Sequence, residues 1–166
     1  MKGLFLAAQP LRMRSYILRM AFLSLAPSLV VGGILFALGA SSKGVPEFQK
    51  GEFGSPPATA ITVFLLYVVF APVTETLLMS LGITLLSLFT KAKAVLAILS
   101  AVIWAGFHSL ASPVWGLVVC WPFFVFSCAY LAWRPKTWFK AIWVAACIHA
   151  LQNLLPALVT VVYLNS

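Results

Sequence analysis

Long apolar runs, separated by short polar or proline- and glycine-containing segments, fill most of this 166-residue chain. Runs of about twenty apolar residues are long enough to cross a bilayer as helices, and they lack the alternation of membrane β-barrel strands. The pattern predicts an all-α, polytopic transmembrane bundle that forms one integral-membrane domain over residues 1–166. The expected spans cover roughly 16–40, 58–90, 94–110, 114–133 and 138 to the end of the sequence.

Prolines are expected to kink the first run at Pro27 and to interrupt two others. The run 58–90 would measure roughly 50 Å as one helix, against about 30 Å of hydrocarbon core. We expect it to be broken, strongly tilted or partly outside the core, with Pro72 as the natural break. A helix restarting at Pro72 would place Glu75 in its first turn, where the helix dipole favours an anion. In the last run, Pro156 predicts a kink.

The basic residues predict the orientation of the bundle. Nine of them fall on one side if the N-terminus is inside, and only Lys43 and Lys50, in the polar loop 41–57, fall on the other. The positive-inside rule then predicts a cytoplasmic N-terminus in a bacterial-type plasma membrane. The first ten residues are too short for a secretory signal and are expected to be a cytoplasmic or interfacial lead-in. The nine are Lys2, Arg12, Arg14, Arg19, Lys91, Lys93, Arg134, Lys136 and Lys140.

Composition excludes several classes of function. Hydrophobic residues make up 63% of the chain and charged residues 8%. This composition is more apolar than a soluble domain of this length requires for its core. The net charge of +8 comes from residues dispersed at the ends of the spans, so it does not indicate nucleic-acid binding. The three cysteines lack the close pairing of a zinc motif and are expected to pack within spans. The six Trp and thirteen Phe are assigned to lipid-facing or interfacial packing.

Against this background Glu75 stands out, because it is the only carboxylate outside the polar loop. A carboxylate at membrane depth costs several kcal/mol unless it is paired, protonated or hydrated, so it marks a functional site by default. Its partners are expected among the polar residues of the other spans. These are His108, His149, Gln152 and Asn153.

Helix rise places these residues at similar depths. Counted from the nearest basic residue, Glu75 lies about 24 Å and His108 about 22 Å from the inner boundary. On the same count, Asn153 lies at about 20 Å and His149 one turn lower at about 14 Å. His149 and Asn153 are four residues apart and project from one helix face. Four polar residues from three spans can therefore share one layer of the bundle.

This set of residues permits the hydrolysis of an amide by two routes. In the first, Glu75 takes a proton from water, His108 orients that water, and Asn153 with His149 binds the oxyanion. In the second, Glu75, His108 and His149 ligate Zn²⁺ with an open position for water. The chain contains no Asp, so a Ser–His–Asp triad is excluded.

Three short motifs resemble those of the CPBP family of intramembrane proteases, which includes the CAAX prenyl endopeptidases and the bacteriocin-immunity (abortive infection) proteins. They are APVTETLLMS from Ala71, WAGFH ending at His108, and HALQN from His149 to Asn153. The resemblance covers about 58–155, and the order and spacing of the motifs agree with the family. It implies a membrane-embedded endopeptidase that acts on peptides or membrane proteins, prenylated ones among them.

The resemblance also implies roles for these residues. Glu75 falls on the family's water-activating base, His108 on its partner, and His149 with Asn153 on the pair that binds the oxyanion. Two positions depart from the pattern, because Thr76 replaces a second Glu and Ser80 replaces an Arg. Losing both together removes a charge pair rather than leaving one charge alone. With one Glu and no Asp, a full metal shell is harder to build, which favours a metal-free glutamate mechanism, with zinc as the alternative.

Three functions are compatible with the sequence. The first is an intramembrane endopeptidase, and the second is a catalytically inactive member of the same fold that acts in bacteriocin immunity or partner binding. The third is a proton-coupled carrier that uses Glu75 and the two histidines as a relay. Five spans without visible repeats are few for a transporter, which argues against this third function. Membrane lipid is a partner in each case.

Overall fold

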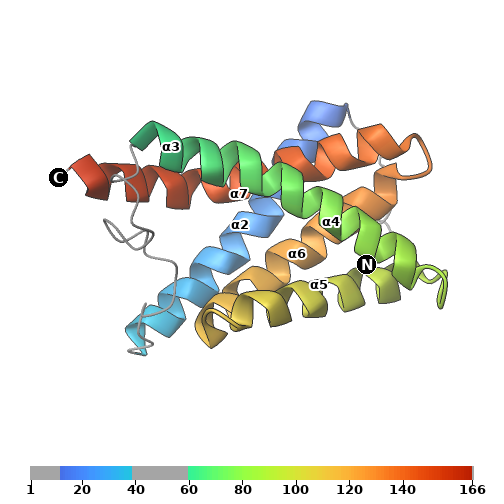
Figure 1. Ribbon diagram of the computed structural model, residues 1–166, viewed down its shortest axis with the longest axis horizontal. Helices are drawn as coiled ribbons and strands as arrows, with labels where there is room; N and C mark the ends of the chain where they lie inside the picture. Colours follow the sequence, from blue (N-terminus) through green and yellow to red (C-terminus); the bar gives the residue numbers. More distant parts are fainter. Residues whose placement is uncertain (1–11, 39–59, 166) are drawn as a thin grey trace.

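The computed structural model of the chain describes residues 12–38 and 60–165, and all regular structure in these two ranges is helical (Figure 1). The predicted all-α bundle is thereby confirmed. The predicted polar loop 41–57 and the lead-in before Arg12 lie outside the described residues, as do Lys2, Lys43 and Lys50. The elements are α2 (Met13–Ala37), α3 (Ala60–Leu65), η1 (Leu66–Phe70), α4 (Ala71–Leu86), α5 (Lys93–Ser109), α6 (Pro113–Trp133) and α7 (Trp138–Asn165).

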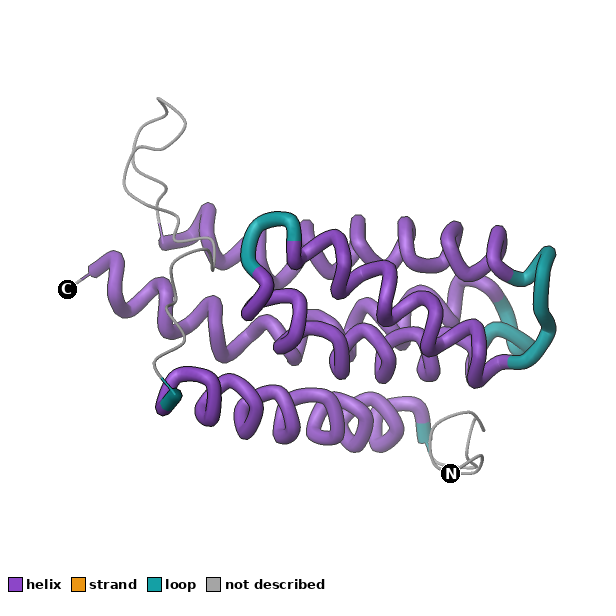
Figure 2. Tube along the Cα trace, turned by 90° about the horizontal axis from the view of Figure 1, so that it is seen from below, coloured by secondary structure: helices purple, strands orange, loops and turns teal. Residues whose placement is uncertain are grey.

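Four stretches of helix are long and apolar enough to cross a membrane: Met13–Leu35, Ile61–Leu86, Pro113–Trp133 and Trp138–Val162. Helix α5 is apolar too but has only 17 residues, the lower end of the length that spans a bilayer. Seen from the side, the helices run in broadly the same direction (Figure 2), and α2 and α6 cross the α3–α4 run obliquely (Figure 1). The chain is an integral membrane protein.

Helix α6 is the centre of the bundle. It packs against α2, α5 and α7, and its second half, from Pro122 to Trp133, is buried almost throughout. Many outward-facing side chains of the other helices are large and apolar, and they are exposed in the described structure, as a lipid-facing surface requires. The most buried helix is therefore the one that other spans surround.

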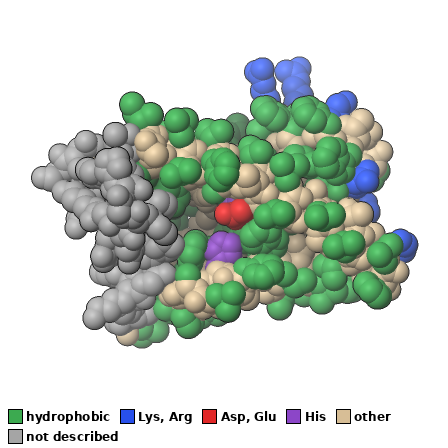
Figure 3. All heavy atoms as spheres, in the orientation of Figure 1, with side chains coloured by type: hydrophobic (Ala, Val, Ile, Leu, Met, Phe, Trp, Pro, Cys, Tyr) green, Lys and Arg blue, Asp and Glu red, His purple; other side chains and the backbone are tan. Residues whose placement is uncertain are grey.

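The basic side chains of the described residues support the predicted arrangement of the spans. The α4–α5 and α6–α7 connections carry Lys91, Lys93, Arg134 and Lys136, and α2 begins beside Arg12. On the face drawn in Figure 3, the blue side chains gather towards one end of the molecule. Which side of the membrane this end faces stays a prediction from the positive-inside rule.

The interruption predicted next to Pro72 is present, but its form differs from the expectation. A π-helical turn, η1, precedes the proline, and the N–H of Ala71 bonds to the oxygen of Leu66. Phe70 and Ala71 keep α-helical dihedral angles, so the backbone passes from α3 to α4 without a new start. The expectation that Glu75 lies in a first helical turn is wrong, because the first turn of α4 contains no acidic residue.

Helices α5 and α6 approach closely at Gly116. A Cβ atom built there would lie 2.6 Å from the backbone oxygen of Ala105 and would collide with the side chain of Ser109. Small residues allow this kind of approach between membrane helices. Gly116 therefore fixes how α5, the helix that carries His108, lies against the buried helix.

Gly116→Ala is expected to destabilise the protein by about 1–3 kcal/mol, because one of the two helices must move to admit the methyl group. The melting temperature of the purified variant in detergent measures this. Gly106→Ala on α5 is the matched control, since nothing lies within 4 Å of the added Cβ there. Equal melting temperatures for the two variants would contradict the close approach.

Candidate active site

The structure brings Glu75 of α4 and His149 of α7 together. The Oε2 atom of Glu75 lies 3.8 Å from Nε2 of His149, a separation that is too long for a hydrogen bond. The side chain of Glu75 is 26% exposed, whereas that of His149 is only 5% exposed. The carboxylate can therefore reach a molecule at the surface of the bundle while it stays next to a buried imidazole.

Two aromatic rings of α6 hold His149 in place. Its ring stacks on Phe126 with centroids 4.4 Å apart, and it meets Phe123 edge-on at 5.6 Å. Nδ1 of His149 is buried and has no hydrogen-bond partner among the described residues. The nitrogen that faces the only carboxylate of the described spans is thus Nε2.

His108 reaches the same aromatic cluster from α5. Its Nδ1 lies 2.8 Å from the carbonyl oxygen of Trp104, one turn earlier. A carbonyl only accepts hydrogen bonds, so Nδ1 carries the hydrogen and Nε2 of the neutral ring keeps its lone pair. The ring lies 4.5 Å from Trp115 and 5.2 Å from Phe123 between centroids. Both histidines therefore contact Phe123.

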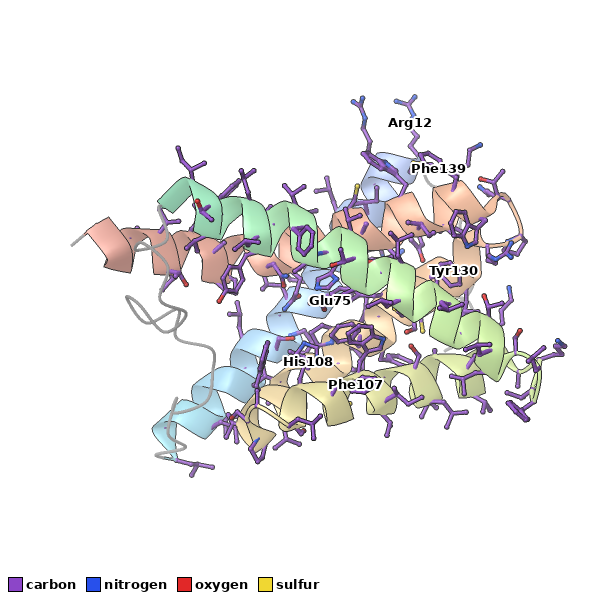
Figure 4. The ribbon with its side chains drawn as sticks, in the orientation of Figure 1. Arg12, Glu75, Phe107, His108, Tyr130 and Phe139 are labelled. Atoms are coloured by element: carbon purple, nitrogen blue, oxygen red, sulfur yellow. The ribbon has the colours of Figure 1, made fainter. Side chains whose placement is uncertain are left out.

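The views of the molecule show that this cluster reaches the surface. Figure 4 shows Glu75 and His108 pointing toward one another from α4 and α5. In Figure 3 an acidic side chain and a histidine lie next to each other on the surface, surrounded by hydrophobic side chains. The polar group is thus displayed on an apolar, lipid-facing side of the bundle.

Asn153 lies one turn beyond His149 on α7, and its side chain turns to the neighbouring run. Its Nδ2 donates a hydrogen bond to the carbonyl oxygen of Tyr67 in η1, at 3.1 Å. Gln152 is half-buried, and its Oε1 has no partner in the described part of the chain. These polar side chains of α7 therefore face protein, and Asn153 connects two spans.

The two positions that depart from the family motif face the core. Thr76 and Ser80 are 1% and 3% exposed. The hydroxyl of Ser80 donates to the backbone oxygen of Leu77 at 2.8 Å, and that of Thr76 has no partner among the described residues. Small neutral side chains therefore fill the place where the family pattern has an ion pair.

Sequence reasoning missed the role of the aromatic residues. Phe123 and Phe126 were assigned to lipid-facing or interfacial packing, and this is wrong, because they are 2% and 1% exposed and lie against the histidines. The available signal was their place on α6, the one run with several aromatic residues and no charged residue.

The described residues do not form a metal shell. In ranges 12–38 and 60–165, no three His, Cys, Asp or Glu side chains group closely enough to hold a metal ion. In this arrangement Glu75, His108 and His149 do not form a three-residue zinc site by themselves.

A groove of about 470 Å³ lies elsewhere, between the η1–α4 segment and the first half of α7. Its lining is almost entirely apolar and includes Val69, Val73, Leu77 and Trp143. None of Glu75, His108, His149 and Asn153 lines it. The polar cluster and this groove are therefore separate features of the surface.

Comparison with protein families decides the relationship of the chain. The sequence model of the type II CAAX prenyl endopeptidase Rce1-like family matches residues 57–155, more than half of the chain. The chain belongs to this family. The matched segment contains all three motifs, and the resemblance to CAAX endopeptidases inferred from them is confirmed. Comparisons with curated proteins and with solved structures find no match.

Proposed function

We propose that this member of the CAAX endopeptidase family hydrolyses a peptide bond within the membrane. The observation that carries the proposal is the partly exposed Glu75 carboxylate held 3.8 Å from the buried His149. An ionisable pair on an apolar face is costly without a function. Membership of the family supports the reaction class.

In the proposed mechanism, Glu75 is the general base. Its carboxylate takes a proton from a water molecule, and the oxygen of that water attacks the carbonyl carbon of the scissile bond. The proton then passes from Glu75 to the leaving nitrogen as the carbon–nitrogen bond breaks. The products are a new carboxylic acid, which then ionises to a carboxylate, and a new amine, and Glu75 is restored.

The two histidines have complementary roles in this proposal. In this proposal the neutral ring of His149 carries its hydrogen on Nε2, the nitrogen 3.8 Å from the carboxylate, and donates it to the oxygen that becomes negative in the tetrahedral intermediate. Nε2 of His108 keeps a lone pair and accepts a hydrogen bond from the attacking water. Asn153 is proposed to share the oxyanion with His149, because one hydrogen of its Nδ2 is bound to the carbonyl of Tyr67 and the amide carries a second.

The substrate is proposed to be a peptide or membrane protein delivered through the lipid, with prenylated peptides as one class. The hydrophobic surroundings of the polar cluster support this choice, since a lipid-facing entrance excludes most soluble peptides (Figure 3). We place the basic end of the bundle in the cytoplasm of a bacterial-type plasma membrane.

A second function has an observation of its own. Thr76 and Ser80 fill the positions of the family's Glu and Arg with buried neutral side chains. A chain that lost catalysis but kept the fold would tolerate this change and would act in partner binding, such as bacteriocin immunity. The two proposals differ in whether any peptide is cleaved.

The test is cleavage of a mixed library of prenylated and unprenylated transmembrane peptides by purified protein in liposomes, with and without a chelator. The proposed mechanism predicts that the chelator changes the rate of cleavage by less than about twofold, because the described residues form no metal shell. Cleavage lost with chelator and restored by zinc would contradict the metal-free mechanism and make the same residues ligands. No cleavage of any peptide would favour the inactive form.

A further inference from the structure

The apolar groove between the η1–α4 segment and the first half of α7 has about the length of one membrane leaflet. On α7 its lining runs from Trp138 to Ala150, which is about 18 Å of helix at 1.5 Å per residue. Half of a hydrocarbon core of about 30 Å is about 15 Å. The length and the almost entirely apolar lining of the groove therefore suit a lipid chain that enters from one face of the membrane.

One end of this groove lies at the basic end of the bundle. Trp138 is the first residue of α7, and the α6–α7 connection before it carries Arg134 and Lys136. Lys136 and Lys140 are exposed, and in the sequence they flank Trp138 and Phe139, two residues of the lining. Cationic side chains therefore lie where the headgroup of a lipid in the groove would be.

Helix α2 brings further positive charge to this region, because it packs against α7. Arg12 and Arg14, at the start of α2, are exposed, and in Figure 4 Arg12 lies on the same side of the molecule as Phe139. Within the described ranges the only carboxylate is that of Glu75, which lies beside His149. The described residues therefore leave this positive charge without an acidic partner, and an anionic headgroup would complement it.

Exposed tryptophans distinguish the groove from the rest of the lipid-facing surface. All six Trp of the chain lie in the described ranges, and the two that are exposed, Trp138 and Trp143, both line the groove. Tryptophan is enriched where lipid headgroups meet the hydrocarbon core. The groove thus combines an apolar channel, interfacial aromatic rings and cationic side chains in the order in which a phospholipid presents its own parts.

We propose that this groove binds an acyl chain of an anionic phospholipid, whose headgroup is held by Lys136 and Lys140. A substrate chain is a less suitable occupant, because Glu75 does not line the groove. Val73 and Leu77 do line it, and each lies two residues from Glu75, which places them on another face of α4. The lipid is therefore a ligand of the fold, and the inference does not depend on the proposed function.

The test measures how two lipids stabilise the purified full chain in detergent. Phosphatidylglycerol, which is anionic, is compared with phosphatidylcholine, which is zwitterionic and is given the same acyl chains. We expect phosphatidylglycerol to raise the melting temperature by about 5 °C more than phosphatidylcholine does, since a ligand that binds only the folded protein stabilises it. Native mass spectrometry should show one phosphatidylglycerol retained by the wild type.

A pair of double variants tests the headgroup contact. Lys136→Gln combined with Lys140→Gln should weaken the binding of phosphatidylglycerol by about tenfold or more and remove most of its advantage in melting temperature. Lys91→Gln combined with Lys93→Gln is the matched control, because it removes the same charge from exposed residues of the α4–α5 connection, which do not flank the groove. The control should keep the advantage.

A second pair of variants tests the acyl-chain site. Val73 lines the groove and is 44% exposed, so Val73→Trp should fill the groove without disturbing the core. Leu78→Trp is the control, because Leu78 is exposed on the same helix but does not line the groove. We expect the retained phosphatidylglycerol and the lipid-induced rise in melting temperature to be lost in Val73→Trp and kept in Leu78→Trp.

Three results would overturn the inference. The first is equal stabilisation of the wild type by the two lipids, and the second is an equal loss in the Lys91–Lys93 and Lys136–Lys140 variants, which would indicate diffuse attraction to the basic end. The third is displacement of phosphatidylglycerol by a prenylated peptide, which would assign the groove to substrate. None of these measurements requires cleavage, so failure of the proposed function is distinguished from failure of this inference.

Discussion

Glu75→Gln is expected to lower kcat/KM for peptide cleavage by about 10³-fold or more, because the amide cannot take a proton from water. The variant should fold at least as well as the wild type, since a neutral amide costs less at membrane depth than a carboxylate. Initial rates of cleavage in liposomes, measured beside the melting temperature, separate the two effects. The size of the expected loss follows from Glu75 being the sole carboxylate of the described residues.

Thr74→Val is the control for this variant. Thr74 lies next to Glu75 on α4, but its hydroxyl donates to the backbone oxygen of Phe70 at 2.8 Å and has no place in the proposed chemistry. Its cleavage rate should stay within about twofold of the wild type. A Glu75→Gln protein that cleaves as fast as the Thr74→Val protein would remove Glu75 from the mechanism.

His149→Phe is expected to lower kcat by about 10²–10³-fold, because the donor to the developing oxyanion is lost. Phenylalanine keeps a ring of similar shape, so the stacking on Phe126 and the contact with Phe123 should be retained. Circular dichroism and melting temperature check that the fold survives. Steady-state rates over a range of substrate concentrations separate the change in kcat from any change in KM.

The outcome that would contradict this role of His149 is a His149→Phe protein that keeps its kcat. A fall in melting temperature without loss of activity would make the histidine a packing residue of α6 and α7. His108→Phe gives a useful comparison, because His108 is assigned only to the orientation of water and its loss should be the smaller of the two.

The sequence predicted that polar residues of three spans share one layer of the bundle, but helix rise placed His149 about 10 Å below Glu75. Counting along helices treats each helix as straight and upright and leaves out the reach of the side chains, so it did not predict that these two residues make contact. The prediction that these spans present polar residues to each other needed no knowledge of side-chain packing. The 3.8 Å separation shows that the two side chains meet.

The sequence pattern could not predict the π-turn. Pro72 indicated where the long run is interrupted, but a π-turn adds only one residue to a turn and has no compositional signature. The bond from Asn153 to Tyr67 was not predicted either, because it depends on how α7 lies against the π-turn. The aromatic contacts of the histidines depend on how α6 is rotated, which periodicity cannot fix for a helix that is apolar on all sides.

The burial of Thr76 and Ser80 explains why both positions depart from the family pattern together. Thr76 and Ser80 lie on the buried face of α4 with Met79. A single charge at either place would be buried without a partner, which is strongly destabilising. The loss of both charges together leaves a neutral core in which Ser127 bonds to Ser100 at 2.9 Å. The structure thus keeps the proposed base while it dispenses with the ion pair.

The measurement that tests the central claim most directly is peptide cleavage in water enriched in ¹⁸O, followed by intact-mass analysis of both products and protein. Activation of water by Glu75 predicts one ¹⁸O atom in the new carboxylate after a single turnover, no covalent adduct on the protein, and no product from the Glu75→Gln variant. A peptide fragment covalently attached to the protein, or equal ¹⁸O-labelled product from Glu75→Gln, would contradict the claim.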